Sequence, residues 1–123
     1  MDSRRQLKIS SLLQQEFSSV LLHEGRNIFG HALVTITRVH VTPDLSIARF
    51  HFSIFNTEDK QAVIDSLQAH LPELRKKLGE KMRFHLRKIP DLQFFLDETL
   101  DHVFRMEEIF KTLHQDHPDN PPQ

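Results

Sequence analysis

The chain has 123 residues, of which 38% are hydrophobic and 27% are charged, values typical of a single folded domain. It contains no cysteine, which excludes disulfides, thiolate metal sites and cysteine nucleophiles. No apolar run approaches the roughly 20 residues that span a bilayer, and the polar N-terminus is unlike a signal peptide. We therefore expect a cytoplasmic protein without a membrane segment.

The net charge of −1 conceals two parts of opposite sign. Residues 1–90 hold 14 Lys and Arg against 9 Asp and Glu, whereas residues 91–123 hold 2 against 8. The basic excess lies in residues 71–90, whose cations are Arg75, Lys76, Lys77, Lys81, Arg83, Arg87 and Lys88. Such a run can bind phosphate by releasing counterions, but it is also typical of a solvated helix face.

The first predicted element is an amphipathic helix over residues 4–22. Its apolar residues recur at spacings of three and four along the chain: Ile9, Leu12, Leu13, Phe17, Val20 and Leu21. This period places them on one helix face, with polar residues between them. We expect the helix to end near Gly25, since glycine is common just after the last helical turn.

Two strands are predicted next, and they are close enough in sequence to form an antiparallel hairpin. The first, Leu33–Val41, is rich in Val, Ile and Thr. Its apolar residues change from even to odd positions near Thr37 and Arg38, which indicates a β-bulge. A turn at residues 42–44 contains proline and aspartate. The second strand, Ile47–Phe55, alternates apolar and polar residues and should be half buried.

A helical stripe follows the hairpin, formed by Val63, Ile64, Leu67, Leu71, Leu74 and Leu78. Asn56 and Thr57 offer N-cap oxygens ahead of it. Pro72 lacks an N–H and crowds the preceding turn, so we expect a kink or two abutting helices near His70. Gly79 is the expected end of this segment, and residues 82–90 receive no prediction.

Residues 92–96 indicate a third strand that is buried on both faces. Asp97 or Thr99 should cap a last helix, whose inward residues are Leu100, Val103, Met106, Phe110 and Leu113. The order of helices and strands predicts an α+β domain, in which helices cover one face of a three-stranded sheet. We place this domain at residues 1–115 and a disordered polar tail at residues 116–123.

Seven short segments, in this order and spacing, resemble those of a known family. They are residues 34–45, 48–49, 53, 74–75, 78–79, 86–94 and 97–99. Together they resemble ribosome-binding factor A over roughly residues 4–113. The resemblance implies a single type II KH-like domain with the order α-β-β-α-kink-α-β-α.

The same resemblance implies a function. Members of this family bind rRNA of the small ribosomal subunit, assist its late maturation and rRNA processing, and are linked to growth in the cold. They are also linked to release by a ribosome-associated GTPase. The resemblance thus implies a non-enzymatic assembly factor, which we expect to be a monomer and to need no cofactor.

One motif departs from RNA-binding KH domains, which clamp the nucleotide backbone with a GxxG loop. The glycines of this chain, Gly25, Gly30 and Gly79, contain no such pair. The family replaces that loop by an Ala-x-Gly kink, but here residues 69–71 carry leucine in the glycine position. We expect Pro72 to supply the break and side chains to make the RNA contacts.

The candidate RNA-binding residues are all cationic: Arg4, Arg5, Lys8, Arg38, Arg49, Arg75, Lys76, Lys77, Lys81, Arg83, Arg87 and Lys88. We expect those after Pro72 to share one wall that faces phosphate. His51 and His85 would assist when protonated. The alternative is a protein-interaction adapter that uses the exposed strand face or the last helix.

No catalytic residue or metal site is assigned. The sequence has no glycine-rich phosphate loop, nucleophile elbow or HExxH motif. The only close histidine pair, His114 and His117, falls near the expected tail, whereas a zinc site needs several ligands at fixed angles. We interpret the ten phenylalanines mainly as core residues, among them Phe50, Phe52, Phe94, Phe104 and Phe110.

Overall fold

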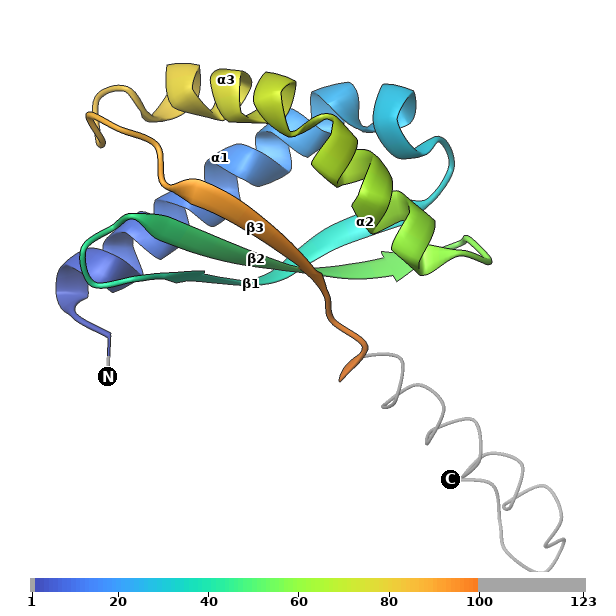
Figure 1. The fold of residues 1–123 in the computed structure, drawn as a ribbon, viewed down its shortest axis with the longest axis horizontal. Helices are drawn as coiled ribbons and strands as arrows, with labels where there is room; N and C mark the ends of the chain where they lie inside the picture. The colour runs from blue at the N-terminus through green and yellow to red at the C-terminus, as the bar shows by residue number, and fades with distance from the viewer. Residues whose placement is uncertain (1, 100–123) are drawn as a thin grey trace, which may run out of the picture.

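The computed structural model describes residues 2–99. They form three helices and a three-stranded sheet in the order α1 (Arg4–Phe29), β1 (Leu33–Val41), β2 (Ile47–Phe55), α2 (Lys60–Ala69), α3 (Leu71–Met82) and β3 (Asp91–Leu96). All helices lie on one side of the sheet (Figure 1), which confirms the α+β, type II KH-like architecture. The predicted last helix, the tail and the domain boundary at residue 115 lie outside the described residues.

The sheet order is β1-β2-β3, with β2 in the centre. β1 pairs with β2 antiparallel, and β3 pairs with β2 parallel. The β1–β2 register shifts between Ile36 and Arg38, so the predicted bulge is confirmed. None of the helices in residues 2–99 is both long and apolar enough to cross a membrane.

The first helix is longer than predicted, because it runs through Gly25 and ends at Phe29. A Cβ atom on Gly25 would lie 2.5 Å from Cζ of Phe29. Glycine is therefore needed for the Phe29 ring to fold back over the helix, and it does not end the helix. The residue that does is Gly30, whose φ of 61° suits glycine.

The break near Pro72 is confirmed as two abutting helices that meet at His70, with proline in the first turn of α3. The prediction that Gly79 ends this segment is wrong, since α3 continues to Met82. A Cβ on Gly79 would lie 3.4 Å from Cγ1 of Ile89. This is an ordinary van der Waals distance, so the space beside Gly79 would accommodate a Cβ.

The N-cap of α2 also differs from the prediction. Asp59, and neither Asn56 nor Thr57, accepts a hydrogen bond from the N–H of Ala62, at 3.0 Å. Asn56 instead takes a φ of 61°, and its side-chain amide donates to the carbonyl of His31 at 3.0 Å. Its short polar side chain tolerates the left-handed turn that ends β2.

The core lies between the sheet and the helices and is centred on Phe17 of α1. Its ring centroid is 4.8 Å from that of Phe50, 5.7 Å from Phe94 and 6.2 Å from Phe52. All four rings are buried, which confirms the core placement of the three strand phenylalanines. Phe104 and Phe110 lie outside the described residues.

The third strand is buried on one face only, contrary to prediction. Leu92 and Phe94 are buried, whereas Phe95 is 40% exposed. The reason is that the described helices cover a single face of the sheet, so alternate side chains of β3 point away from them. An apolar run therefore did not mean burial on both sides.

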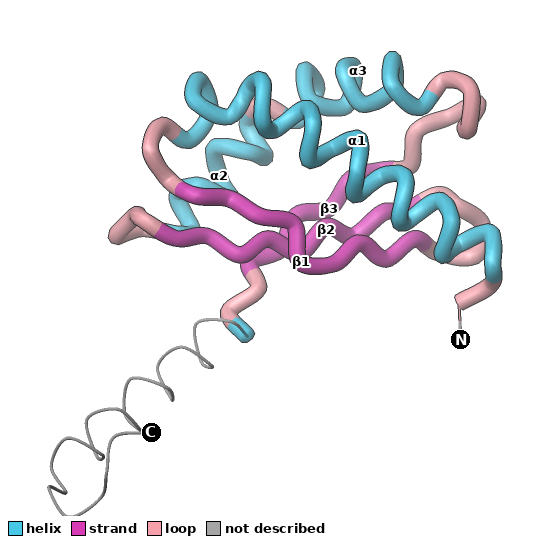
Figure 2. Tube along the Cα trace, turned by 180° about the vertical axis from the view of Figure 1, so that it is seen from behind, coloured by secondary structure: helices cyan, strands magenta, loops and turns pink. Residues whose placement is uncertain are grey.

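The free edge of β1 is covered by α1, which passes beside it in Figure 2. Gln6 donates from Nε2 to the carbonyl of Val41 at 2.9 Å, and Gln14 donates to the carbonyl of Ile36 at 3.3 Å. Gln6 also closes a capping box with Ser3 at the start of the helix. These bonds satisfy edge carbonyls that would otherwise lack a partner.

Candidate nucleic-acid interface

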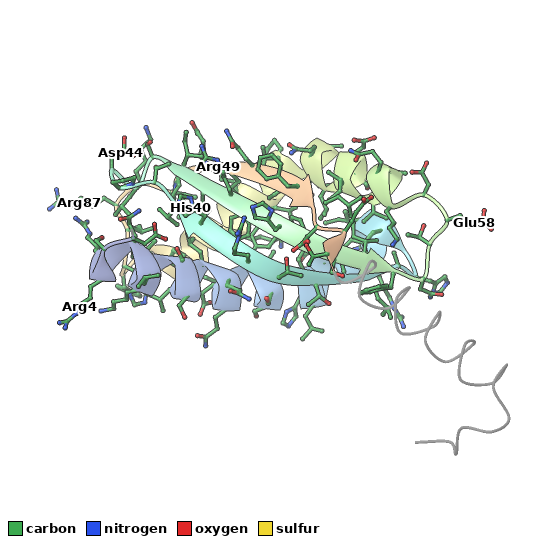
Figure 3. The ribbon with its side chains drawn as sticks, turned by 90° about the horizontal axis from the view of Figure 1, so that it is seen from below. Arg4, His40, Asp44, Arg49, Glu58 and Arg87 are labelled. Atoms are coloured by element: carbon green, nitrogen blue, oxygen red, sulfur yellow. The ribbon has the colours of Figure 1, made fainter. Side chains whose placement is uncertain are left out.

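A pocket of about 590 Å³ opens at one end of the molecule. The start of α1, the β1–β2 turn and the segment between α3 and β3 enclose it, and we call it the end pocket. Its positively charged lining residues are Arg5, Arg83, Arg87 and Lys88. Figure 3, which looks onto the open sheet face, labels Arg87, Arg4 and Asp44 at this end.

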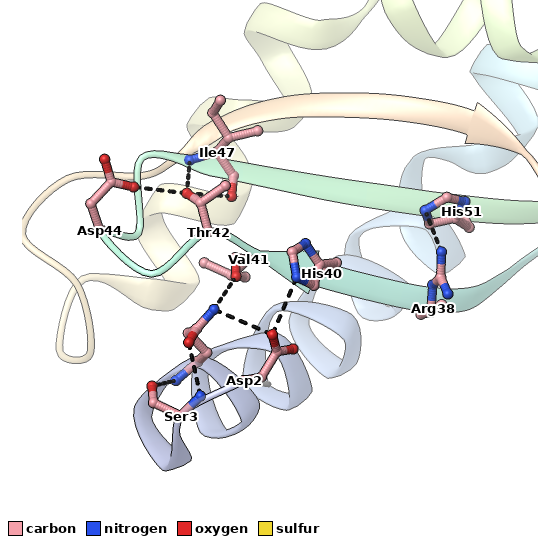
Figure 4. A network of polar contacts seen from close by, with 10 residues as sticks. Asp2, Ser3, Arg38, His40, Val41, Thr42, Asp44, Ile47 and His51 are labelled. Carbon is pink, nitrogen blue, oxygen red and sulfur yellow. Dashed lines mark hydrogen bonds and ion pairs between the residues drawn. The ribbon is translucent and has the colours of Figure 1, made fainter.

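The carboxylates in the end pocket are Asp44 and Asp91. Asp44 accepts a hydrogen bond from Thr42 Oγ1 at 2.8 Å (Figure 4). It also accepts from Ser46 N at 3.1 Å and from Ser46 Oγ at 2.7 Å. The Ser46 hydroxyl, then that of Thr42, lower the pKa of Asp44. All three bonds end on Oδ1 of Asp44, so this carboxylate is fixed by the β1–β2 turn that it holds in place.

The four cations of the end pocket come from two segments, the start of α1 and residues 83–88. Within residues 2–99, no ion pair joins Arg5, Arg83, Arg87 or Lys88 to a carboxylate. The Arg83 guanidinium lies 4.7 Å from the ring centroid of Phe84, which is 82% exposed. These cations are therefore available to an anionic ligand.

Two cations of α3 are engaged by other groups of the protein and do not line the end pocket. Arg75 donates to the carbonyl of Ile89 at 2.7 Å and lies 3.9 Å from Asp91. Lys77 lies 3.0 Å from Glu24 of α1, whose hydrogen bond and charge raise the pKa of Lys77. The expectation that every cation after Pro72 shares one wall is therefore wrong, because these two have partners within the protein.

The remaining cations of the first and third helices are exposed. Arg4 and Lys8 lie on the first turns of α1 and extend the basic surface next to Arg5. Lys76 and Lys81 are exposed on α3, but they do not line the end pocket. Only part of the basic run is thus gathered around that pocket.

Strand pairing places Arg38 and Arg49 on another surface, the open face of the sheet. Arg38 is paired with His51 across the hairpin, and Arg49 is paired with His40. Arg38 Nη2 lies 3.3 Å from His51 Nε2 (Figure 4). Burial, followed by the charge of Arg38, lowers the pKa of His51, which disfavours the protonated ring that the prediction from sequence requires.

Sequence reasoning missed Phe95 and His40 on this open face. Phe95 was assigned to a fully buried strand, and its ring instead stacks on His51 with centroids 5.3 Å apart. The alternation of side chains along a strand could have identified it, because Phe95 directly follows the buried Phe94 and so points to the opposite face. His40 could have been found in the same way, as it precedes the buried Val41.

Comparison with known proteins decides the family. The sequence model described as ribosome-binding factor A matches residues 5–110. The chain belongs to the ribosome-binding factor A family. Its relatives include ribosome-binding factor A of Cytophaga hutchinsonii, which is 38% identical and aligns over 92% of this chain and 85% of its own length. The ribosome-binding factor A of Chlorobium luteolum is 36% identical and aligns over 96% of this chain and 98% of its own length.

Solved structures of ribosome-binding factor A share the fold. A crystal structure of the protein from Thermus thermophilus gives a TM-score of 0.60 at 18% identity, covering 74% of this chain and 94% of that one. A homology model of the Thermus thermophilus protein, fitted into a cryo-EM map of a 30S complex, gives a TM-score of 0.52 at 21% identity, covering 79% of this chain and 96% of that one. Both likenesses confirm the KH-like fold.

Proposed function

We propose that this chain is a non-enzymatic assembly factor that binds rRNA of the small ribosomal subunit and assists its late maturation, including rRNA processing. Membership of the ribosome-binding factor A family supports this, as does the fitting of a similar protein into a map of a 30S complex. The observation that carries the proposal is the gathering of four cations around the end pocket. Phosphate binding depends on such clusters.

The fold gathers the cations of the end pocket from two segments into one surface. Arg5 is at the start of α1, and Arg83, Arg87 and Lys88 follow α3. Two arginines beside each other can each hold a phosphate through paired N–H groups. A surface of this kind fits one arrangement of the RNA backbone better than others, and tighter binding to that arrangement raises its population without chemistry.

The break between α2 and α3 plays a structural part in this proposal. His70 joins the two helices directly, and its ring and backbone N–H both contact the carbonyl of Ser66. No GxxG loop stands at this position to offer backbone N–H groups to RNA. Contacts therefore come from side chains, as the end pocket provides.

The finer features implied by the family resemblance belong to the same proposal. The protein would act as a monomer in the cytoplasm, support growth in the cold, and be released by a ribosome-associated GTPase. A demand in the cold is physically reasonable, because misfolded RNA rearranges more slowly at low temperature, so a factor that favours one conformation matters more there.

Co-sedimentation with immature and mature small subunits tests the proposal. The pocket variant combines Arg83→Gln, Arg87→Gln and Lys88→Gln, whereas the matched helix variant combines Lys76→Gln, Lys77→Gln and Lys81→Gln. Both remove three positive charges from adjacent parts of the chain. We expect the pocket variant to lose most of its association with immature subunits and the helix variant to keep it.

Equal association of wild type and both variants would contradict RNA binding through the end pocket. If that association were also insensitive to salt, the protein-interaction adapter would be the better interpretation. RNA contacts weaken steeply as salt rises, because counterions return to the phosphates. Circular dichroism of each variant checks that the fold is intact.

A further inference from the structure

The open face of the sheet carries a row of flat side chains that crosses all three strands. Arg38 of β1 is paired with His51 of β2, and His51 is paired with Phe95 of β3. The rings of His51 and Phe95 are stacked, with an interplanar angle of 24° and centroids 5.3 Å apart. The Arg38 guanidinium lies 3.3 Å from the imidazole.

A second row lies two residues along the strands. His40 of β1 is paired with Arg49 of β2, and Arg49 is paired with Gln93 of β3. Two residues along a strand correspond to about 7 Å, so the two rows are neighbours on the same face. Figure 3 shows Arg49 and His40 on this face, toward the end where Asp44 and Arg87 lie.

The charges on this face suit an anionic partner with flat groups. Arg38 and Arg49 contribute the fixed positive charges, while the nearby carboxylates lie at the margins. Asp2 lies 3.3 Å from His40 at the edge of the sheet. Asp97 and Glu98, after the end of β3, line a hollow together with Arg38 and His51. The Thr37 hydroxyl donates to Asp97 at 2.7 Å and fixes the position of this carboxylate without neutralising it.

We propose that the open sheet face binds an unpaired segment of RNA, with one base stacked on the His51–Phe95 pair and flanking phosphates held by Arg38 and Arg49. Bases stack on aromatic side chains regardless of sequence, and a basic surface follows the backbone. The face is a poorer match for an apolar protein partner, because cations and polar side chains surround its exposed aromatic ring. This inference rests on the proposed function, since both take RNA as the partner.

The composition of the chain provides a direct test. It contains no tryptophan and no tyrosine, so Phe95→Trp would place a sole indole reporter on the open sheet face. The probe is an oligouridylate of about 8 nucleotides, within the range that one small domain binds. We expect this RNA to quench the indole emission, because a stacked base lies against the ring.

A matched reporter and an affinity measurement complete the test. Leu22→Trp places an indole at a position that is 84% exposed on α1 and outside both surfaces, and its emission should not change. With a labelled oligouridylate, Phe95→Leu should weaken binding about 5- to 150-fold, whereas Phe95→Tyr should keep most of it. Leucine keeps the apolar volume but lacks the flat ring, so this pair separates stacking from packing.

The outcomes separate this inference from the proposed function. Quenching that persists when the pocket variant is added to Phe95→Trp supports an independent site on the sheet face. No quenching, while the wild-type chain still co-sediments with small subunits, overturns the inference and leaves the function standing. An emission shift with rRNA-free small-subunit proteins, but none with oligouridylate, would overturn it in favour of a protein contact.

Discussion

Neutralising the end pocket should reduce the salt dependence of RNA binding by a calculable amount. Each cation that neutralises a phosphate of single-stranded RNA contributes about 0.7 to the slope of log K against log salt. Replacing Arg83, Arg87 and Lys88 by glutamine should therefore lower the slope by about 2. Between about 50 and 200 mM salt, the loss of affinity should then be about 20-fold smaller than for wild type.

The assay is fluorescence anisotropy with a labelled fragment of small-subunit rRNA at several salt concentrations. The helix variant is the control, because it has the same net charge but changes lysines that do not line the end pocket. One of these, Lys77, already has Glu24 as a partner at 3.0 Å. If the two variants gave equal slopes, charge alone would govern binding and the end pocket would have no special part.

Three further predictions concern the stability of the fold. Gln6→Ala should cost about 1–3 kcal/mol in urea denaturation, because a buried edge carbonyl loses its donor; an unchanged midpoint would contradict this. Gly25→Ala should lower the Tm, since its Cβ would meet the Phe29 ring. In a Phe29→Ala background the same change should instead stabilise the protein by about 1 kcal/mol. A lower Tm in that background would refute the steric reason. The Thr37 hydroxyl and the N–H of Thr99 lower the pKa of Asp97 from 3.8 to about 2, so its stabilisation is complete above pH 4 and is lost as pH falls through 2; by NMR, Thr37→Val should raise that pKa, and no change would exclude the hydroxyl as the cause.

Local patterns in the sequence predicted most of the fold. The parity change in Leu33–Val41 located the bulge, and Pro72 located the break between α2 and α3. Both depend on neighbouring residues alone, through side-chain alternation and the geometry of proline. The ends of helices were harder to predict, because Gly25 serves a contact with Phe29 that no local pattern reveals, and Gly79 does not interrupt α3.

The candidate sites were predicted less well, because charge runs do not say which cations are already paired. Arg75 and Lys77 are adjacent to the free cations in sequence, yet each is engaged by a group from a distant segment. The exposed face of β3 was missed for a related reason. Whether Phe95 is buried depends on which faces of the sheet the helices cover, and that is a property of the assembled domain.

Both proposed surfaces depend on the parallel pairing of β3 with β2. The β1–β2 hairpin closes over a short turn, whereas β3 can pair only after residues 56–90 have crossed over the sheet. Long-range pairings of this kind form slowly. Detachment of β3 would remove Phe95 from the open face and release the segment that carries Arg87 and Lys88, so hydrogen exchange at this strand would report the integrity of both surfaces together.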